Sequence, residues 1–270
     1  MSRVNTVTIR KNKVSEGFSP LVAVTAYDYT FAKLIDGLVD IVLVGDSLGM
    51  VVQGQPNTLS VTLDEMVYHS KCVAAGLSNA HLVVDMPFMS YQINLESALK
   101  NAGRLLSEGK AHAVKMEGGV SIASTITRMV EIGIPVMGHI GLTPQSVHAL
   151  GGYRVQGKSD SARESIIQDA IALEDAGVYS IVLEGIPLEL AQAITERVKV
   201  PTIGIGAGPH CDGQILVLQD FLGLNTDFQP KFVKQFARLA EQTRAAVSTY
   251  ASEVKQKSFP EKEHSFHVNT

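Results

Sequence analysis

The chain has 270 residues, of which 45% are hydrophobic and 19% charged, so its length and composition suit one large folded domain rather than a disordered segment. The net charge is −4 and basic residues are scattered, which argues against nucleic-acid or membrane partners and favours small molecules. Cys72 and Cys211 lie far apart and outside any C-x-x-C pattern, so no disulfide framework is predicted. Because the N-terminus lacks an apolar signal core, we expect a cytoplasmic protein.

Short runs of β-branched residues alternate with longer stretches whose apolar residues recur at helical spacing. In chain order, the predicted strands cover residues 21–28, 40–47, 81–87, 112–119, 135–141, 179–185, 201–208 and 214–220. The predicted helices cover residues 30–38, 63–75, 95–108, 121–132, 163–176, 188–198 and 231–250. Such continuously apolar strands need cover on both faces, which the crossover helices of a parallel sheet provide.

Eight strand units in a chain of this length predict an α/β fold, a (β/α)8 TIM barrel, which typically takes roughly 250 residues. An open doubly wound sheet is the alternative, and the polar strand ends favour the barrel. We expect a single catalytic domain over residues 1–252 and a polar, frayed tail over residues 253–270. The segment LTPQSVHALGGYRVQGKSDSA, after the fifth strand, predicts either a mobile active-site cover or a solvated loop.

Ionisable side chains end five of the predicted strands. They are Asp46, Asp85, Lys115, Glu117, His139 and Glu184. Because the carboxyl ends of parallel strands share one face of a barrel, we expect these side chains to converge there. Each carboxylate taken alone suits a structural role, as a helix cap or in a salt bridge, as well as it suits a functional one. Buried charges need a metal, an opposite charge or a ligand, so the set as a whole favours a functional site.

The carboxylates of Asp46 and Asp85 are hard oxygen ligands of the kind that Mg²⁺ takes, usually one or two per ion. Glu117 suits the role of a further metal ligand, or that of a hydrogen-bond acceptor that holds a metal-bound water. Lys115 lies on the same side of its strand as Glu117, and is predicted to bind a substrate carboxylate, to offset enolate charge or to pair with Glu117. Glu184 ends an apolar strand and is either a general base or a salt-bridge partner.

The strings TAYD, VGDSLGMV, VVDMPF, VKMEGG, PVMGHIGLTPQS, GGYRVQGK, IVLEGIP and IGIGAGPHCDGQILVLQDFLG together resemble the ketopantoate hydroxymethyltransferase family. The resemblance runs in order from about residue 6 to residue 244. It implies a (β/α)8 enzyme of pantothenate biosynthesis that moves a hydroxymethyl group from 5,10-methylenetetrahydrofolate to 3-methyl-2-oxobutanoate, giving 2-dehydropantoate. It also implies one divalent ion such as Mg²⁺ per subunit and a homo-oligomer, commonly a decamer.

The family's functional residues are carried over where the motifs match. The resemblance implies Asp46, Asp85 and Glu117 at the metal, Ser47, Asp85 and Lys115 at the keto acid, Glu184 as the base and His139 beside it. These roles fit a reaction through a metal-stabilised enolate, because a 2-oxo acid chelates a divalent ion that polarises its ketone.

Two alternatives stay open. A lyase or mutase of the phosphoenolpyruvate mutase and isocitrate lyase group would use a similar barrel, but neither Cys72 nor Cys211 stands in the K-K-C-G-H loop usual there. The second alternative is a barrel that binds a keto acid without turnover. The presence of Asp46, Asp85 and Glu184 argues against this alternative.

Overall fold

The structure of the chain is a computed structural model that describes residues 4–227 and 229–268. It divides into two compact units, residues 1–218 and residues 219–270. The barrel lies in the first unit. The predicted boundary of the catalytic domain at residue 252 stays a prediction, since residues 219–252 belong to the second unit.

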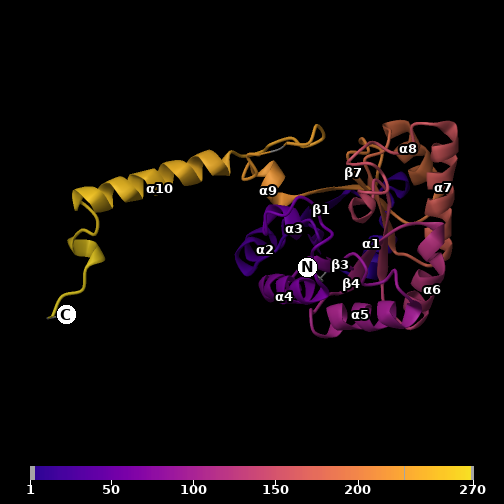
Figure 1. Cartoon of the computed structure of the whole chain (residues 1–270), viewed down its shortest axis with the longest axis horizontal. Coiled ribbons are helices and arrows are strands. Elements are labelled where there is room, and N and C mark those ends of the chain that lie inside the picture. Colours follow the sequence, from indigo (N-terminus) through magenta and orange to yellow (C-terminus); the bar gives the residue numbers. More distant parts are fainter. Residues whose placement is uncertain (1–3, 228, 269–270) are drawn as a thin grey trace. The chain divides into compact units, whose positions relative to one another are not determined.

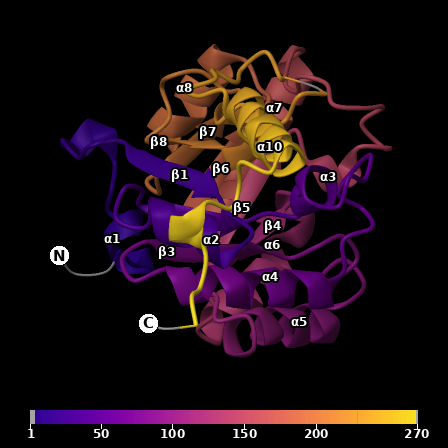
Figure 2. The same ribbon diagram turned by 90° about the vertical axis from the view of Figure 1, so that its left-hand side faces the viewer.

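Eight parallel strands close into a barrel in chain order, with β8 paired to β1 (Figure 1, Figure 2). The strands are β1 (Leu21–Thr25), β2 (Ile41–Val44), β3 (His81–Asp85), β4 (Ala113–Glu117), β5 (Val136–Gly141), β6 (Ser180–Glu184), β7 (Thr202–Ile205) and β8 (Gly213–Leu216). Every predicted strand is present, and the closed barrel confirms the predicted fold class over the open sheet.

In the first unit, one helix precedes β1 and other helices follow most of the strands. They are α1 (Thr6–Arg10), α2 (Tyr29–Ile35), α3 (Leu48–Val51), α4 (Leu63–Gly76), α5 (Leu95–Ser107), α6 (Ala123–Glu131), α7 (Asp160–Asp175) and α8 (Leu188–Arg197), with short 3₁₀ turns η1 (Val14–Glu16), η2 (Val120–Ile122) and η3 (Pro144–Ser146). Residues 206–212, all of them described, link β7 to β8 without a helix. Local sequence sets several helix starts; at α4, Thr62 and Glu65 form a capping box.

Two hydrophobic layers follow from the alternation of side chains along each strand. Residues of one parity, among them Val83, Ala113, Met137 and Val182, pack together inside the barrel. Residues of the other parity pack outward against the helices. The next inward positions along the same four strands, two residues later, are Asp85, Lys115, His139 and Glu184. The barrel interior therefore changes from apolar to charged at the carboxyl ends of these strands.

The second unit contains α9 (Leu218–Phe221), which begins at the last residue of the first unit, followed by α10 (Leu239–Gln256) and η4 (Lys262–His264). The predicted helix was wrong over residues 231–238, because backbone N–H groups there bond outside a helical pattern, as Phe236 N does to Phe221 O at 2.7 Å. α10 runs into the predicted tail as far as Gln256. None of the helices in the described residues has the length and apolarity to cross a membrane.

A buried ion pair joins the segment before β1 to the barrel at the amino end of β8. Lys13 Nζ lies 2.8 Å from Asp212 Oδ2 and also donates to Thr195 O at 2.8 Å. Asp212 accepts from the backbone N–H groups of Val14 and Thr202, both at 2.9 Å. These bonds satisfy both charges, and they join a segment near the N-terminus to the link between β7 and β8.

Replacing Lys13 by Met is expected to lower the free energy of unfolding by about 3 kcal/mol, because Asp212 would stay buried without a cation. Urea denaturation followed by circular dichroism measures the change. Lys33→Met, at an exposed lysine of α2, is the control and should shift stability by less than about 0.5 kcal/mol. Equal losses in both variants would contradict the assignment.

Candidate active site

The structure brings the predicted site residues together at the carboxyl ends of β2 to β6. Asp46 and Ser47 follow β2, and the other positions lie within the last residues of their strands. The parallel register sets two neighbours directly, since Asp85 pairs with Lys115 and Glu117 pairs with His139. The predicted convergence of these side chains is therefore present in the fold, while the role of each residue is a separate question.

Lys115 is the fixed positive charge of the cluster. Its Nζ lies 2.8 Å from Asp85 Oδ1 and 3.9 Å from Glu117 Oε1, and all three side chains are buried. Burial by itself lowers the pKa of Lys115, but Asp85, Glu117 and Asp46 more than offset it and hold the pKa above its usual value. Lys115 is therefore an ammonium ion at neutral pH.

Asp46 is the carboxylate that lacks a cation. Its oxygen Oδ2 accepts from Gln145 Nε2 at 2.8 Å, and its backbone N–H donates to Asp85 Oδ2 at 3.1 Å. Among the described residues, no lysine, arginine or histidine lies within 4.0 Å of its carboxylate. Burial, followed by the charges of Asp85 and Glu117, raises the pKa of Asp46 well above its usual value. Additional positive charge nearby would favour its ionised form.

His139 stands between two carboxylates. Its Nδ1 lies 3.2 Å from Lys115 Nζ and 3.5 Å from Glu117 Oε1, and its Nε2 lies 3.2 Å from Glu184 Oε2. Burial and Lys115 lower the pKa of His139, but Glu117 and Glu184 outweigh them and raise the pKa to about 9. A bond from Lys115 to Nδ1 needs a neutral ring, whereas an imidazolium suits Glu117 instead. In both states Nε2 carries the hydrogen that faces Glu184.

Glu184 is the acidic group that a substrate in the barrel mouth can reach. Its side chain is 17% exposed, against 2% for His139 and 3% for Glu117. Its backbone is fixed, because Glu184 O accepts from Leu142 N at 2.8 Å at the start of the segment after β5. Glu184 therefore combines a fixed backbone with an accessible carboxylate.

Three neutral residues of the site were missed by sequence reasoning. Tyr27 OH lies 2.8 Å from Ser47 Oγ, and Tyr91 OH lies 2.9 Å from both Glu117 O and Gln145 Oε1. Gln145 contacts Asp46 through its side chain and Glu117 Oε2 through its backbone N–H. Tyr27 and Gln145 stand in the strings TAYD and GLTPQS, but a search for ionisable strand ends does not select neutral residues.

The donor set suits a divalent ion held by two carboxylates. In the part of the chain that the structure describes, no three His, Cys, Asp or Glu side chains form a ready metal-binding group. Mg²⁺ needs only one or two protein carboxylates and takes its other ligands from water and substrate, so Asp46 and Asp85 fit it. Glu117 as a third ligand stays a prediction, since its Oε2 already accepts from Gln145 N at 2.9 Å.

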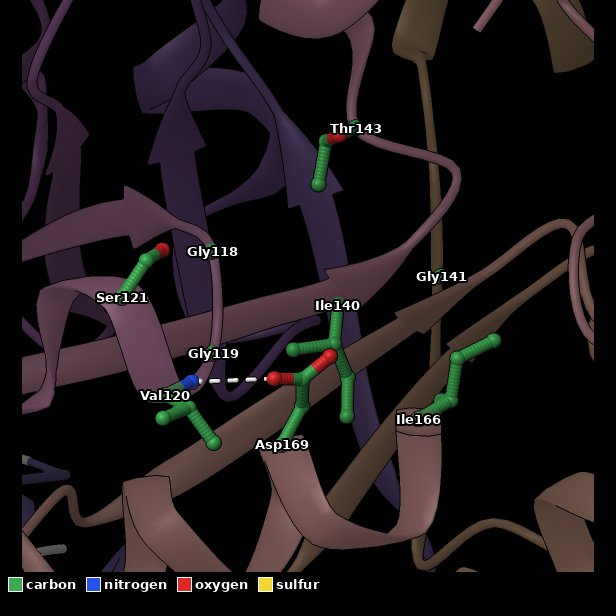
Figure 3. A pocket seen from close by; sticks show the side chains of 9 residues that line it. All are labelled: Gly118, Gly119, Val120, Ser121, Ile140, Gly141, Thr143, Ile166 and Asp169. Carbon is green, nitrogen blue, oxygen red and sulfur yellow. Dashed lines mark hydrogen bonds between the residues drawn. The ribbon is translucent and has the colours of Figure 1, made fainter. Parts of the chain in front are cut away.

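A cavity of about 470 Å³ lies outside the barrel wall, between the turn after β4 and helix α7 (Figure 3). None of the predicted site residues is among its lining residues. In it, Asp169 Oδ1 accepts from Val120 N at 2.9 Å, and a side-chain carbon on Gly119 would collide with the Asp169 side chain. Close packing against α7 therefore explains a glycine two residues after Glu117.

A family profile and individual relatives of known name both assign the chain to the same family. The profile of the family described as ketopantoate hydroxymethyltransferase matches residues 3–262. A 3-methyl-2-oxobutanoate hydroxymethyltransferase of Clostridium beijerinckii is 56% identical over 92% of this chain and 91% of its own. The protein of the same name from a Thermoanaerobacter strain is 54% identical over 98% of this chain and 96% of its own.

Among solved structures, the barrel is similar to more distant proteins. A phosphonopyruvate hydrolase in complex with oxalate and Mg²⁺ superposes with a TM-score of 0.61 at 12% identity, covering 98% of this chain and 93% of its own. A 2,3-dimethylmalate lyase of the PEP mutase/isocitrate lyase superfamily gives 0.59 at 17% identity, covering 98% and 89%. At these identities the likeness concerns the fold alone.

Replacing Gly119 by Ala is expected to lower the free energy of unfolding by about 1–3 kcal/mol, because the new methyl group overpacks the contact with Asp169. Thermal and urea denaturation measure the loss. Gly103→Ala is the matched control, since Gly103 lies in α5 with open space around it and Ala favours a helix by up to about 1 kcal/mol. The two substitutions should therefore change stability in opposite directions, and a neutral Gly119→Ala would contradict the packing argument.

Proposed function

We propose that this chain, which belongs to the ketopantoate hydroxymethyltransferase family, transfers a hydroxymethyl group from 5,10-methylenetetrahydrofolate to 3-methyl-2-oxobutanoate. The product is 2-dehydropantoate, an intermediate of pantothenate biosynthesis. The observation that carries the proposal is the buried carboxylate cluster, in which Asp46 has no cation partner among residues 4–227 and 229–268 while Lys115 and Glu184 stand at the same mouth. The agreement of profile and relatives over nearly the whole chain supports it.

Asp46 and Asp85 would hold one divalent ion such as Mg²⁺, with Glu117 close by. When bound, the ion supplies a Lewis acid that polarises the keto group of the substrate and offsets the excess negative charge of the cluster. Ser47 would donate to the substrate carboxylate, with Tyr27 OH, 2.8 Å from Ser47 Oγ, donating to it in turn. The Lys115 ammonium would attract the same negatively charged substrate.

Glu184 is the proposed base that removes the proton from C3 of the keto acid. The side chain borders the open mouth, and His139 Nε2 lies 3.2 Å from Glu184 Oε2, so the imidazole can hold the carboxylate in one orientation. The electron pair left by the proton moves toward the keto oxygen. Lys115, held in place by Asp85, provides positive charge where that negative charge develops.

The nucleophilic C3 carbon then attacks the methylene group of the folate. The new carbon–carbon bond forms as the bond from the methylene carbon to one folate nitrogen breaks. Water then replaces the remaining folate nitrogen at that carbon and supplies the hydroxyl oxygen, which releases tetrahydrofolate and 2-dehydropantoate. The segment after β5 borders this mouth: Gln156 N donates to Gly185 O at 2.9 Å, and Tyr153 OH lies 3.6 Å from Met50 Sδ.

Lyase or mutase chemistry receives no support from the cysteines. Cys72 lies in α4, and Cys211 is buried between β7 and β8, away from the strands that carry the cluster. We expect a homo-oligomer, such as a decamer, in the cytoplasm, and light scattering on the purified protein tests the oligomer.

Exchange of the C3 proton of 3-methyl-2-oxobutanoate with deuterated water tests the proposal. With Mg²⁺ and tetrahydrofolate, the protein is expected to exchange this proton, and Glu184→Gln should slow the exchange by about 100-fold or more because the base is lost. Proton NMR measures the rate. Glu189→Gln, at an exposed glutamate of α8, is the control and should match the wild type. Exchange that survives in Glu184→Gln would contradict the role of the base.

Removal of the metal gives a second test. Treatment with EDTA is expected to bring exchange to the background rate, and added Mg²⁺ should restore it. Asp46→Asn should raise the Mg²⁺ concentration needed for half-maximal exchange, because one of two ligand carboxylates becomes a neutral amide. Full exchange in the presence of EDTA would show that the carboxylates serve another purpose.

A further inference from the structure

Gln145 is a buried neutral residue whose side-chain amide and backbone N–H both form hydrogen bonds at the carboxylate cluster. Its side-chain Nε2 donates to Asp46 Oδ2 at 2.8 Å and to Met86 O at 2.9 Å. Its Oε1 accepts from Tyr91 OH at 2.9 Å and from Gln92 Nε2 at 3.0 Å. Its backbone N–H donates to Glu117 Oε2 at 2.9 Å.

We propose that Gln145 is a positioning residue that fixes the orientation of the Asp46 and Glu117 carboxylates for divalent-ion binding. The inference rests on the proposed function for its purpose. The residue that would orient these carboxylates lies at the start of the segment after β5, and it is neither a strand-end acid nor a proposed metal ligand.

The direction of the amide is determined by its partners. Met86 O can only accept and lies 2.9 Å from Nε2, and Gln92 Nε2 donates to Oε1 at 3.0 Å, so the NH₂ group is the part that must face Asp46. A flipped amide would put an oxygen against a carboxylate and lose these bonds. Tyr91 OH accepts from Glu117 N at 3.2 Å, and its single hydrogen can be donated either to Gln145 Oε1 or to Glu117 O, both at 2.9 Å. The direction of the Gln145 amide is the same in both cases.

Gln145 also supplies what a charged residue could not supply at this place. Asp46, Asp85 and Glu117 are buried together, and a further carboxylate would add repulsion, whereas a lysine would compete with the metal for Asp46. A neutral amide donates a hydrogen bond to Asp46 and leaves the net charge of the cluster unchanged. Holding one oxygen of Asp46 fixes the plane in which the other oxygen can bind an ion.

The position of Gln145 in the fold connects three strands. It lies in η3, directly after β5, and its bonds reach Asp46 after β2, Met86 after β3 and Glu117 at the end of β4. Carboxylates from β2 and β4 are thus held by one residue that belongs to neither strand. Their relative orientation therefore depends on Gln145 as well as on the register of the barrel.

Gln145→Met tests the inference, because Met keeps the length of the side chain and removes the amide. The measurement is the affinity of the substrate-free, purified protein for Mn²⁺, followed by the EPR signal of the free ion. We expect the affinity to fall by about 10-fold or more. Gln168→Met in α7 is the matched control and should leave Mn²⁺ affinity unchanged, since Gln168 is exposed and its side chain donates to Glu164 Oε1.

Tyr91→Phe provides a second variant if Gln145→Met does not fold. It removes one of the two donors that hold Oε1 and is expected to weaken Mn²⁺ binding in the same direction, by a smaller factor. A residue that only stabilises the fold would lower the thermal midpoint and leave the affinity of the folded protein unchanged. Unchanged Mn²⁺ affinity in the folded variants would therefore overturn the inference.

The two proposals fail in different ways. Wild-type protein that exchanges no C3 proton would remove the proposed function, while a weaker Mn²⁺ affinity in Gln145→Met would still support the positioning role. Wild-type exchange together with equal Mn²⁺ affinities in wild type and Gln145→Met would keep the function and remove the positioning role.

Discussion

Burial of negative charge at the carboxyl ends of neighbouring strands is the constraint on which the rest of the site depends. Asp46, Asp85 and Glu117 are all buried, and Lys115 is the ammonium that lies against Asp85 and Glu117. Asp46 has an amide for a partner instead of a cation. Such a cluster is unfavourable by itself, because burial and like charges both oppose ionisation. Under the proposed function, a divalent ion held by Asp46 and Asp85 would offset this charge, and an anionic substrate would chelate the ion.

The barrel tolerates this cost because the charged layer lies directly above a packed apolar layer. Val83 and Met137 fill the interior two positions before Asp85 and His139, so the strands that carry the charges are anchored by hydrophobic contacts. Two further contacts limit movement at the ends of the strands, where Gly119 packs against Asp169 and Leu142 N bonds to Glu184 O. These two contacts hold the backbone at the ends of β4 and β6, next to Glu117 and at Glu184.

The sequence allowed the fold and the charged half of the site to be predicted, for physical reasons that differ. Apolar runs such as IVLV predict buried strands, and an acid that follows such a run must meet the others if the strands are parallel. The structure confirms the closed barrel and the convergence of Asp85, Lys115 and His139. The strict alternation of side chains made this part accessible, because it needs no knowledge of loops.

The neutral partners and the loop geometry could not be predicted in the same way. Gln145 and Tyr91 contact each other although they are 54 positions apart in the sequence. A lone Gln or Tyr carries no periodic signal from which such a contact could be predicted. At residues 231–238 a periodic signal was present but misleading. The apolar spacing predicted a helix, whereas backbone N–H groups of this segment donate to Phe221 O in α9. Tertiary hydrogen bonds decided both cases.

Anomalous diffraction from crystals grown with Mn²⁺ and 3-methyl-2-oxobutanoate would test the central claim most directly. The account predicts one anomalous peak per subunit, bound by the carboxylates of Asp46 and Asp85, with the carboxylate and keto oxygens of the keto acid completing its ligands and Glu184 facing C3. A peak held by other residues, or no peak at Mn²⁺ concentrations that support proton exchange, would contradict it.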